Sequence, residues 1–117
     1  MKIGLYETRG SSAFFRETCR SGVVWFVRDE EGSPAPLFED GTRSLPYWST
    51  RARAQRAAEI WGHGLRVDSL RLHAWRDVDL PDAARAGYMI GIHWTGPRLV
   101  GWSFTPAEAL NRLAAAR

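Results

Sequence analysis

The chain has 117 residues, of which 44% are hydrophobic and 25% are charged, with 16 Lys and Arg against 13 Asp and Glu. This composition is typical of one globular domain, which at this length can fold without a metal or a disulfide. The single Cys excludes an intrachain disulfide, and no apolar run approaches the roughly 20 residues that span a bilayer. We therefore expect one domain over residues 1–117, in a reduced, cytoplasmic setting and without a membrane.

The first half of the chain is predicted to hold two helices. A helix over residues 11–20 is favoured by the capping serines at its start and by Gly22 beyond its end. A second helix begins after Ser49 or Thr50 and ends near Trp61. Small residues at helical spacing let this helix lie close to a sheet: Ala54, Ala57 and Ala58. The segments expected to be extended are 23–27, 35–38 and 45–48, and turns are expected at 29–34 and 39–41.

The second half is predicted to hold a hairpin. Apolar residues alternate with polar ones over 65–72, but Leu65 and Val67 are in the opposite phase to Leu70 and Leu72. This pattern indicates either a bulged strand or a loop leading into a helix. Residues 75–80 have helical spacing, and Pro81 forces a break or a fresh helix start. The strict alternation over 88–94 is the clearest strand, and 99–104 returns beside it after a short turn.

The last helix carries the strongest local signal. Residues 105–108 read Thr-Pro-Ala-Glu, a capping box with Pro at the first helical position, and Leu110, Leu113 and Ala114 form the inward stripe. Helices and hairpins interleaved in this order predict an α+β domain with a largely antiparallel sheet and three to four helices packed on it.

The six Trp residues are expected to fall into two groups. Those within strands should pack inside: Trp25, Trp94 and Trp102. Those at element ends should be partly exposed, as amphipathic rings often are at interfaces and pockets: Trp48, Trp61 and Trp75.

Reactive side chains are scattered along the sequence. His63, His73 and His93 have no metal-ligand spacing, and we interpret them as a loop, a surface and a strand-face residue. Cys19 lies late on an apolar helix face, which favours a structural role. Phosphate-binding glycine loops and nucleophile elbows are not found. We therefore expect no metal, no cofactor and no enzymatic activity.

Charge is segregated in the middle of the chain. Residues 29–40 hold five carboxylates and no basic residue, and arginines occupy 43–56. A turn of carboxylates can block a basic cleft, while Trp and Arg provide interface anchors. The residues expected to bind a partner are Asp29, Glu30, Glu31, Glu39, Asp40, Trp48, Arg51, Arg53 and Arg56.

The order of motifs resembles a known family. SGVVW is followed by DEEG, then by LPYW leading into a helix, then by the Leu80-Pro81 break, and finally by a hairpin closing on SFTPAEAL. This order is similar to the bacterial domain-of-unknown-function family numbered 2750, over roughly residues 12–114. The resemblance implies a small α+β protein and supplies no catalytic residue.

The sequence favours a non-enzymatic protein-binding module. An immunity-type or antitoxin-like protein would block a site on a toxin or effector encoded nearby. One alternative is a small-molecule pocket between sheet and helix, lined by Trp48, Trp61 and His93. Weak nucleic-acid binding is a further alternative and is unlikely, because the arginines of 51–56 do not share one face of their helix.

Overall fold

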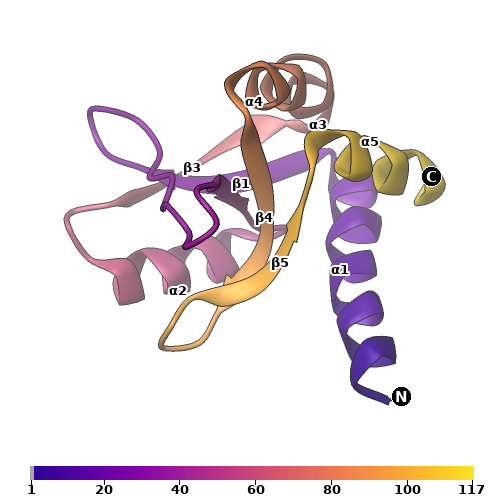
Figure 1. Cartoon of the computed structure of the whole chain (residues 1–117), viewed down its shortest axis with the longest axis horizontal. Coiled ribbons are helices and arrows are strands. Elements are labelled where there is room, and N and C mark those ends of the chain that lie inside the picture. The colour runs from indigo at the N-terminus through magenta and orange to yellow at the C-terminus, as the bar shows by residue number, and fades with distance from the viewer. Residues whose placement is uncertain (1) are drawn as a thin grey trace.

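The computed structural model describes the backbone of residues 2–117 and the side chains of residues 11–117. Helices and strands interleave along this part of the chain (Figure 1). In chain order the elements are α1 (Lys2–Ser21), β1 (Val23–Arg28), β2 (Arg43–Tyr47), α2 (Arg51–Trp61), β3 (Arg66–Arg71), α3 (Leu72–Ala74), η1 (Trp75–Asp79), α4 (Leu80–Ala86), β4 (Tyr88–Thr95), β5 (Val100–Phe104) and α5 (Pro106–Ala115). The predicted α+β class is confirmed.

The strands form two groups that meet at one point. Strand β1 pairs antiparallel with β3, whereas β2 pairs parallel with β4, which in turn pairs antiparallel with β5. Trp25 of β1 and Trp48, directly after β2, exchange backbone hydrogen bonds of 2.9 and 2.8 Å between amide nitrogen and carbonyl oxygen. This bridge places the strands in the order β3, β1, β2, β4, β5.

Two apolar cores cover the strands. The larger one contains Phe14 and Phe15 of α1, Trp75, Ile90 of β4 and Leu113 of α5. The smaller one lies under α2 and includes Trp48, Trp94 and the helix's buried alanines. Figure 1 shows α1 and α5 on one side of the molecule and α2 at the lower left. The alanine face predicted for the second helix therefore does pack on strands, as α2 contacts β1, β3 and β4.

Local capping signals explain several of these boundaries, but the helix expected to start at the serines Ser11 and Ser12 begins earlier, at Lys2. Thr50 caps α2 by accepting a hydrogen bond from the Arg53 amide, and Thr105 and Glu108 form the predicted capping box of α5. The ambiguous segment 65–72 supplies strand β3. Both alternatives expected at Pro81 are wrong, because the backbone stays helical from α3 through α4, and the π-helical turn η1 directly precedes the proline's helix.

Some expectations are wrong. Residues 35–38 form no strand and make only an isolated bridge between Leu37 and Arg43, because Pro34 and Pro36 lack the amide donors that a ladder needs. Two of the Trp residues expected at the surface are fully covered: Trp48 is 1% exposed and Trp75 is not exposed at all.

The regular alternation predicted over 88–94 is broken by a bulge. The register of β4 against β5 shifts between Ile92 and Thr95, and His93 adopts a left-handed φ of 55°. As a result, both His93 and Trp94 are buried. The opposing Gly101 leaves the space that this bend requires, since a Cβ there would lie 2.7 Å from the Ile92 carbonyl oxygen.

Candidate functional site

A buried polar cluster lies where α1 crosses the ends of the parallel strands β2 and β4. Ser49 follows β2 and precedes the cap of α2, His93 lies on the bulge of β4, and Glu17 comes from α1. The Ser49 hydroxyl donates to a carboxylate oxygen of Glu17 and lies 2.8 Å from His93 Nε2. Ser49 and His93 are 3% and 4% exposed.

The proton arrangement in this cluster follows from counting donors. A serine hydroxyl has one hydrogen, so when it donates to Glu17, the His93 Nε2–H must donate to the Ser49 oxygen. Burial, and next the positive charge of Arg53, lower the pKa of His93 from 6.5 to about 4, against the opposing effect of Glu17. The imidazole is therefore neutral at pH 7.

This arrangement differs from that of a hydrolase triad. There the imidazole accepts the serine proton and a carboxylate orients the other ring nitrogen, whereas here the carboxylate contacts the serine itself. None of the hollows described below is lined by Ser49 or His93. The cluster ties α1 to the sheet, and local spacing could not reveal it because Ser49 and His93 are 44 residues apart.

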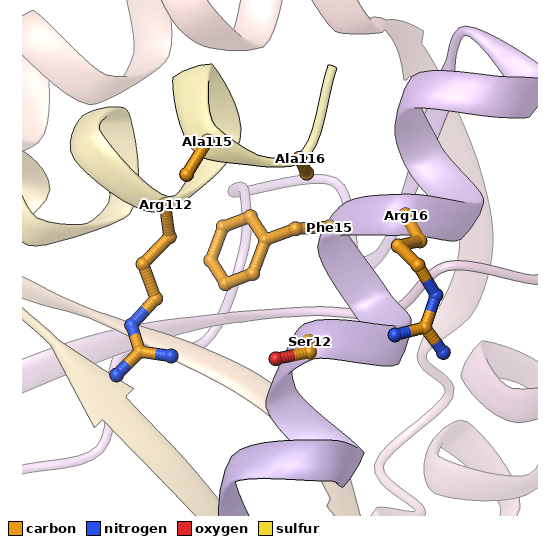
Figure 2. Close-up of a pocket in the computed structure, with 6 residues that line it drawn as sticks. All are labelled: Ser12, Phe15, Arg16, Arg112, Ala115 and Ala116. Carbon is orange, nitrogen blue, oxygen red and sulfur yellow. The ribbon is translucent and has the colours of Figure 1, made fainter.

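A surface groove runs between α1 and α5 (Figure 2). Its first hollow, of about 310 Å³, is lined by Ser12, Phe15, Arg16, Arg112, Ala115 and Ala116. Its second hollow, of about 490 Å³, shares Arg16 and Ala116 and is also lined by Cys19, Arg20, Leu72, Arg76 and Arg117. We call the two hollows together the arginine groove.

The arginine groove follows from helical spacing on both of its walls. Ser12, Phe15, Arg16, Cys19 and Arg20 recur along one face of α1 at intervals of three, one, three and one residues. On the other wall, small alanines follow Arg112 three and four residues later. In Figure 2, Phe15 points from α1 toward α5, and the Arg112 and Arg16 guanidinium groups lie to either side of its ring. The floor is apolar and the rim is cationic.

Most arginines of the rim form no close ion pair with a described carboxylate. Arg76 forms an ion pair with Asp77, with 2.7 Å between Nε and Oδ1. Among the residues whose side chains are described, no carboxylate lies within 4.0 Å of the guanidinium nitrogens of Arg16, Arg20, Arg112 or Arg117. The Arg112 guanidinium instead lies over the Phe104 ring, 4.7 Å from its centre. No local sequence pattern indicates this site, because its arginines lie near the two ends of the chain and at position 76.

The predicted acidic partner residues lie on the connection between β1 and β2. Asp29 closes a turn by accepting from the Glu31 and Gly32 amides, and Glu30 forms an ion pair with Arg66 at 3.0 Å. Asp40 accepts from the Thr42 amide and hydroxyl, at 2.9 and 2.6 Å. Among the five acidic residues of the predicted set, two are exposed without a hydrogen bond or ion pair to the described residues: Glu31 and Glu39.

The predicted anchors near α2 need correction. Trp48 cannot anchor a partner at the surface, because it is 1% exposed and its indole N–H donates to the Trp94 carbonyl over 2.8 Å. Arg51 lies over the Trp25 ring at 6.0 Å from its centre. The other two arginines of the set, Arg53 and Arg56, are exposed beside a depression of only about 20 Å³.

That depression also bears on the predicted small-molecule pocket. Its volume holds about one water molecule, so this depression is too small for a metabolite. Nor do the three predicted lining residues converge on it: Trp61 packs on Trp94 with ring centres 6.5 Å apart, and His93 points to Ser49 and to the Phe14 ring. The geometry gives this alternative no support.

One further hollow, of about 310 Å³, lies beside α4. Tyr47, Tyr88, Asp79 and Asp82 line it together with Leu45, Ala83 and Ala86. Burial and the neighbouring Asp82 raise the pKa of Asp79, whereas a hydrogen bond to Tyr47 lowers it. Within the described part of the chain, no group of three or more His, Cys, Asp or Glu side chains is placed to hold a metal ion.

The comparisons with known proteins concern the fold and not the chemistry. A family model described as a protein of unknown function, DUF2750, matches residues 11–113. The chain belongs to this family. The resemblance seen in the sequence is thereby confirmed, and DUF2750 membership assigns no activity to the arginine groove. No curated protein matches the chain.

One similar solved structure is that of Tic22 from Anabaena, which is described as a protein of protein transport. It is 16% identical with a TM-score of 0.41, and the match covers 70% of this DUF2750 chain and 45% of that chain. The chain thus spans less than half the length of that structure. Across residues 2–117, none of the helices is both long enough and apolar enough to cross a membrane.

Proposed function

We propose that this chain is a protein-binding module whose arginine groove binds an acidic segment of a partner protein. The observation that carries the proposal is the groove itself, where most of the guanidinium groups around an apolar floor form no close ion pair with a described carboxylate. Guanidinium groups bind carboxylates in a bidentate manner, and apolar contacts beneath them add affinity. An immunity-type or antitoxin-like role, directed at a toxin or effector encoded nearby, is one form of this function.

The floor favours a protein over a nucleic acid. A single strand of nucleic acid stacks its bases on exposed aromatic rings along a basic path. The ring in this floor, Phe15, is 1% exposed and is packed edge to face against Phe14 and Phe104. It therefore offers no stacking face, whereas small apolar side chains of a protein segment can fill the space beside Ala115 and Ala116.

Co-purification with charge-reversed variants tests the proposal. The groove variant is Arg16→Glu/Arg112→Glu, and the matched control is Arg85→Glu/Arg98→Glu, which makes the same charge change at exposed positions outside the groove. Tagged wild type is expressed together with the genes adjacent to its own. We expect a stoichiometric partner that the control retains and the groove variant loses. A partner kept equally by both variants would exclude the groove, and the absence of any stoichiometric partner would overturn the protein-binding function.

A further inference from the structure

We propose that the arginine groove also receives the loop over residues 36–42 of a second copy of this chain, so that copies associate head to tail. This inference rests on the proposed function, because it assumes that the groove binds acidic segments carrying an apolar side chain. It names one such segment from this chain's own surface.

The 36–42 loop has the chemistry that the groove lacks. Leu37 and Phe38 are 59% and 42% exposed, and two exposed carboxylates follow them, Glu39 and Asp40. The loop thus presents apolar side chains beside negative charge, and the groove presents an apolar floor beneath positive charge. The two surfaces are complementary in both respects.

The loop is also held in shape before it binds. The Phe38 amide donates to the Thr42 carbonyl over 2.8 Å, and the Gly41 amide donates to the Phe38 carbonyl over 3.0 Å. At its base, an Arg43 guanidinium nitrogen donates to the Ala35 carbonyl over 2.9 Å. A preorganised loop loses little conformational entropy on docking, which favours association even through a small contact.

The occupant must come from another molecule. Figure 1 shows the connection between β1 and β2 to the left of β4, and α1 and α5 to the right. Within one molecule, no residue of the loop lines either hollow of the groove. Loop and groove are different surfaces, so the contact is heterologous and generates chains or rings of copies. A contact of one loop with one groove is small, and we therefore expect weak association that salt suppresses.

Sedimentation equilibrium of the purified chain tests the inference. We expect the average mass of the wild type to rise with protein concentration at about 50 mM salt and to return to the monomer value at about 500 mM salt. The loop variant is Leu37→Ser/Glu39→Lys, and the groove variant is Arg16→Glu/Arg112→Glu. Each alone should stay monomeric, because each lacks one half of the contact.

Mixing the two variants supplies the decisive control. The groove variant keeps an intact loop and the loop variant keeps an intact groove, so an equimolar mixture should form a heterodimer that neither forms alone. Val78→Ser/Glu31→Lys makes the same chemical changes at exposed positions outside the loop and should associate like the wild type.

The outcomes separate this inference from the proposed function. A wild type that stays monomeric at every concentration, with a partner still captured through the groove, would overturn the self-association alone. Association that persists in the groove variant would also overturn it, because another surface would then be responsible. Loss of the partner from the control as well as from the groove variant would count against the proposed function and leave the sedimentation result unaffected.

Discussion

The buried imidazole of His93 makes the stability of this protein depend on pH in a defined window. The pKa of His93 is lowered from 6.5 to about 4, first by burial and next by Arg53, with Glu17 opposing. Below pH 6.5 the unfolded chain binds a proton at this position, whereas the folded chain binds it only near pH 4. Unfolding therefore takes up a proton between these values, and the free energy of unfolding falls as the pH falls.

The size of this effect follows from the two pKa values. Relative to pH 8, this one group lowers the free energy of unfolding by about 2 kcal/mol at pH 5 and by about 3 kcal/mol at pH 4. These losses are a large part of the roughly 5–15 kcal/mol that typically separates folded from unfolded domains. Above pH 7 this loss is absent, because His93 is then neutral in both the folded and the unfolded state, and the free energy of unfolding no longer depends on this group.

Replacing His93 with Gln removes the titrating group and keeps an amide donor for the Ser49 oxygen. Urea unfolding of wild type and His93→Gln between pH 8 and pH 4 measures the difference. The wild type should lose about 2 kcal/mol more than the variant between pH 8 and pH 5. Since the left-handed backbone at this position suits Asn, His93→Asn provides a second variant, and His73→Gln controls for the loss of an exposed imidazole. Parallel pH profiles for wild type and both His93 variants would refute this account of the buried cluster.

Three further substitutions test the geometry by urea unfolding at pH 7. Ser49→Ala leaves Glu17 and His93 without their shared partner and should cost about 1–3 kcal/mol, whereas an unchanged midpoint would mean that the cluster contributes nothing. Gly101→Ala places a Cβ against the Ile92 carbonyl and the Trp94 ring and should cost about 1–3 kcal/mol, so a neutral result would disprove the tight packing of the bulge. Thr105→Ala removes the cap of α5 and should lower the free energy of unfolding by about 1 kcal/mol. A variant as stable as the wild type would contradict this role of the cap.

Local signals in the sequence were sufficient for several elements. The caps at Thr50 and Thr105 fixed where two helices begin, and the alanine face of α2 was predicted from spacing alone. The segment 35–38 failed, because its apolar side chains suggested a strand while its flanking prolines removed the necessary donors. These features depend on neighbours within a few residues, which is the range over which propensity and capping act.

The burial of Trp48 and the two candidate sites, which are the buried polar cluster and the arginine groove, lay beyond that range. Trp48 was expected at the surface because it lies at the end of an element, yet its indole N–H finds the Trp94 carbonyl and the ring is buried. The arginine groove brings together Arg16 and Arg112, which lie near opposite ends of the sequence. Helical spacing predicts which residues share a face, but it does not predict which two faces meet, and both sites depend on such meetings.

The affinity of the captured partner for groove and control variants tests the central claim most directly. Isothermal titration of the purified partner into Arg16→Glu/Arg112→Glu should give a dissociation constant at least about tenfold weaker than that of the wild type, equivalent to about 1.4 kcal/mol. The control Arg85→Glu/Arg98→Glu should stay close to the wild type. Equal affinities for the groove variant and the wild type would contradict the assignment of binding to the groove between α1 and α5.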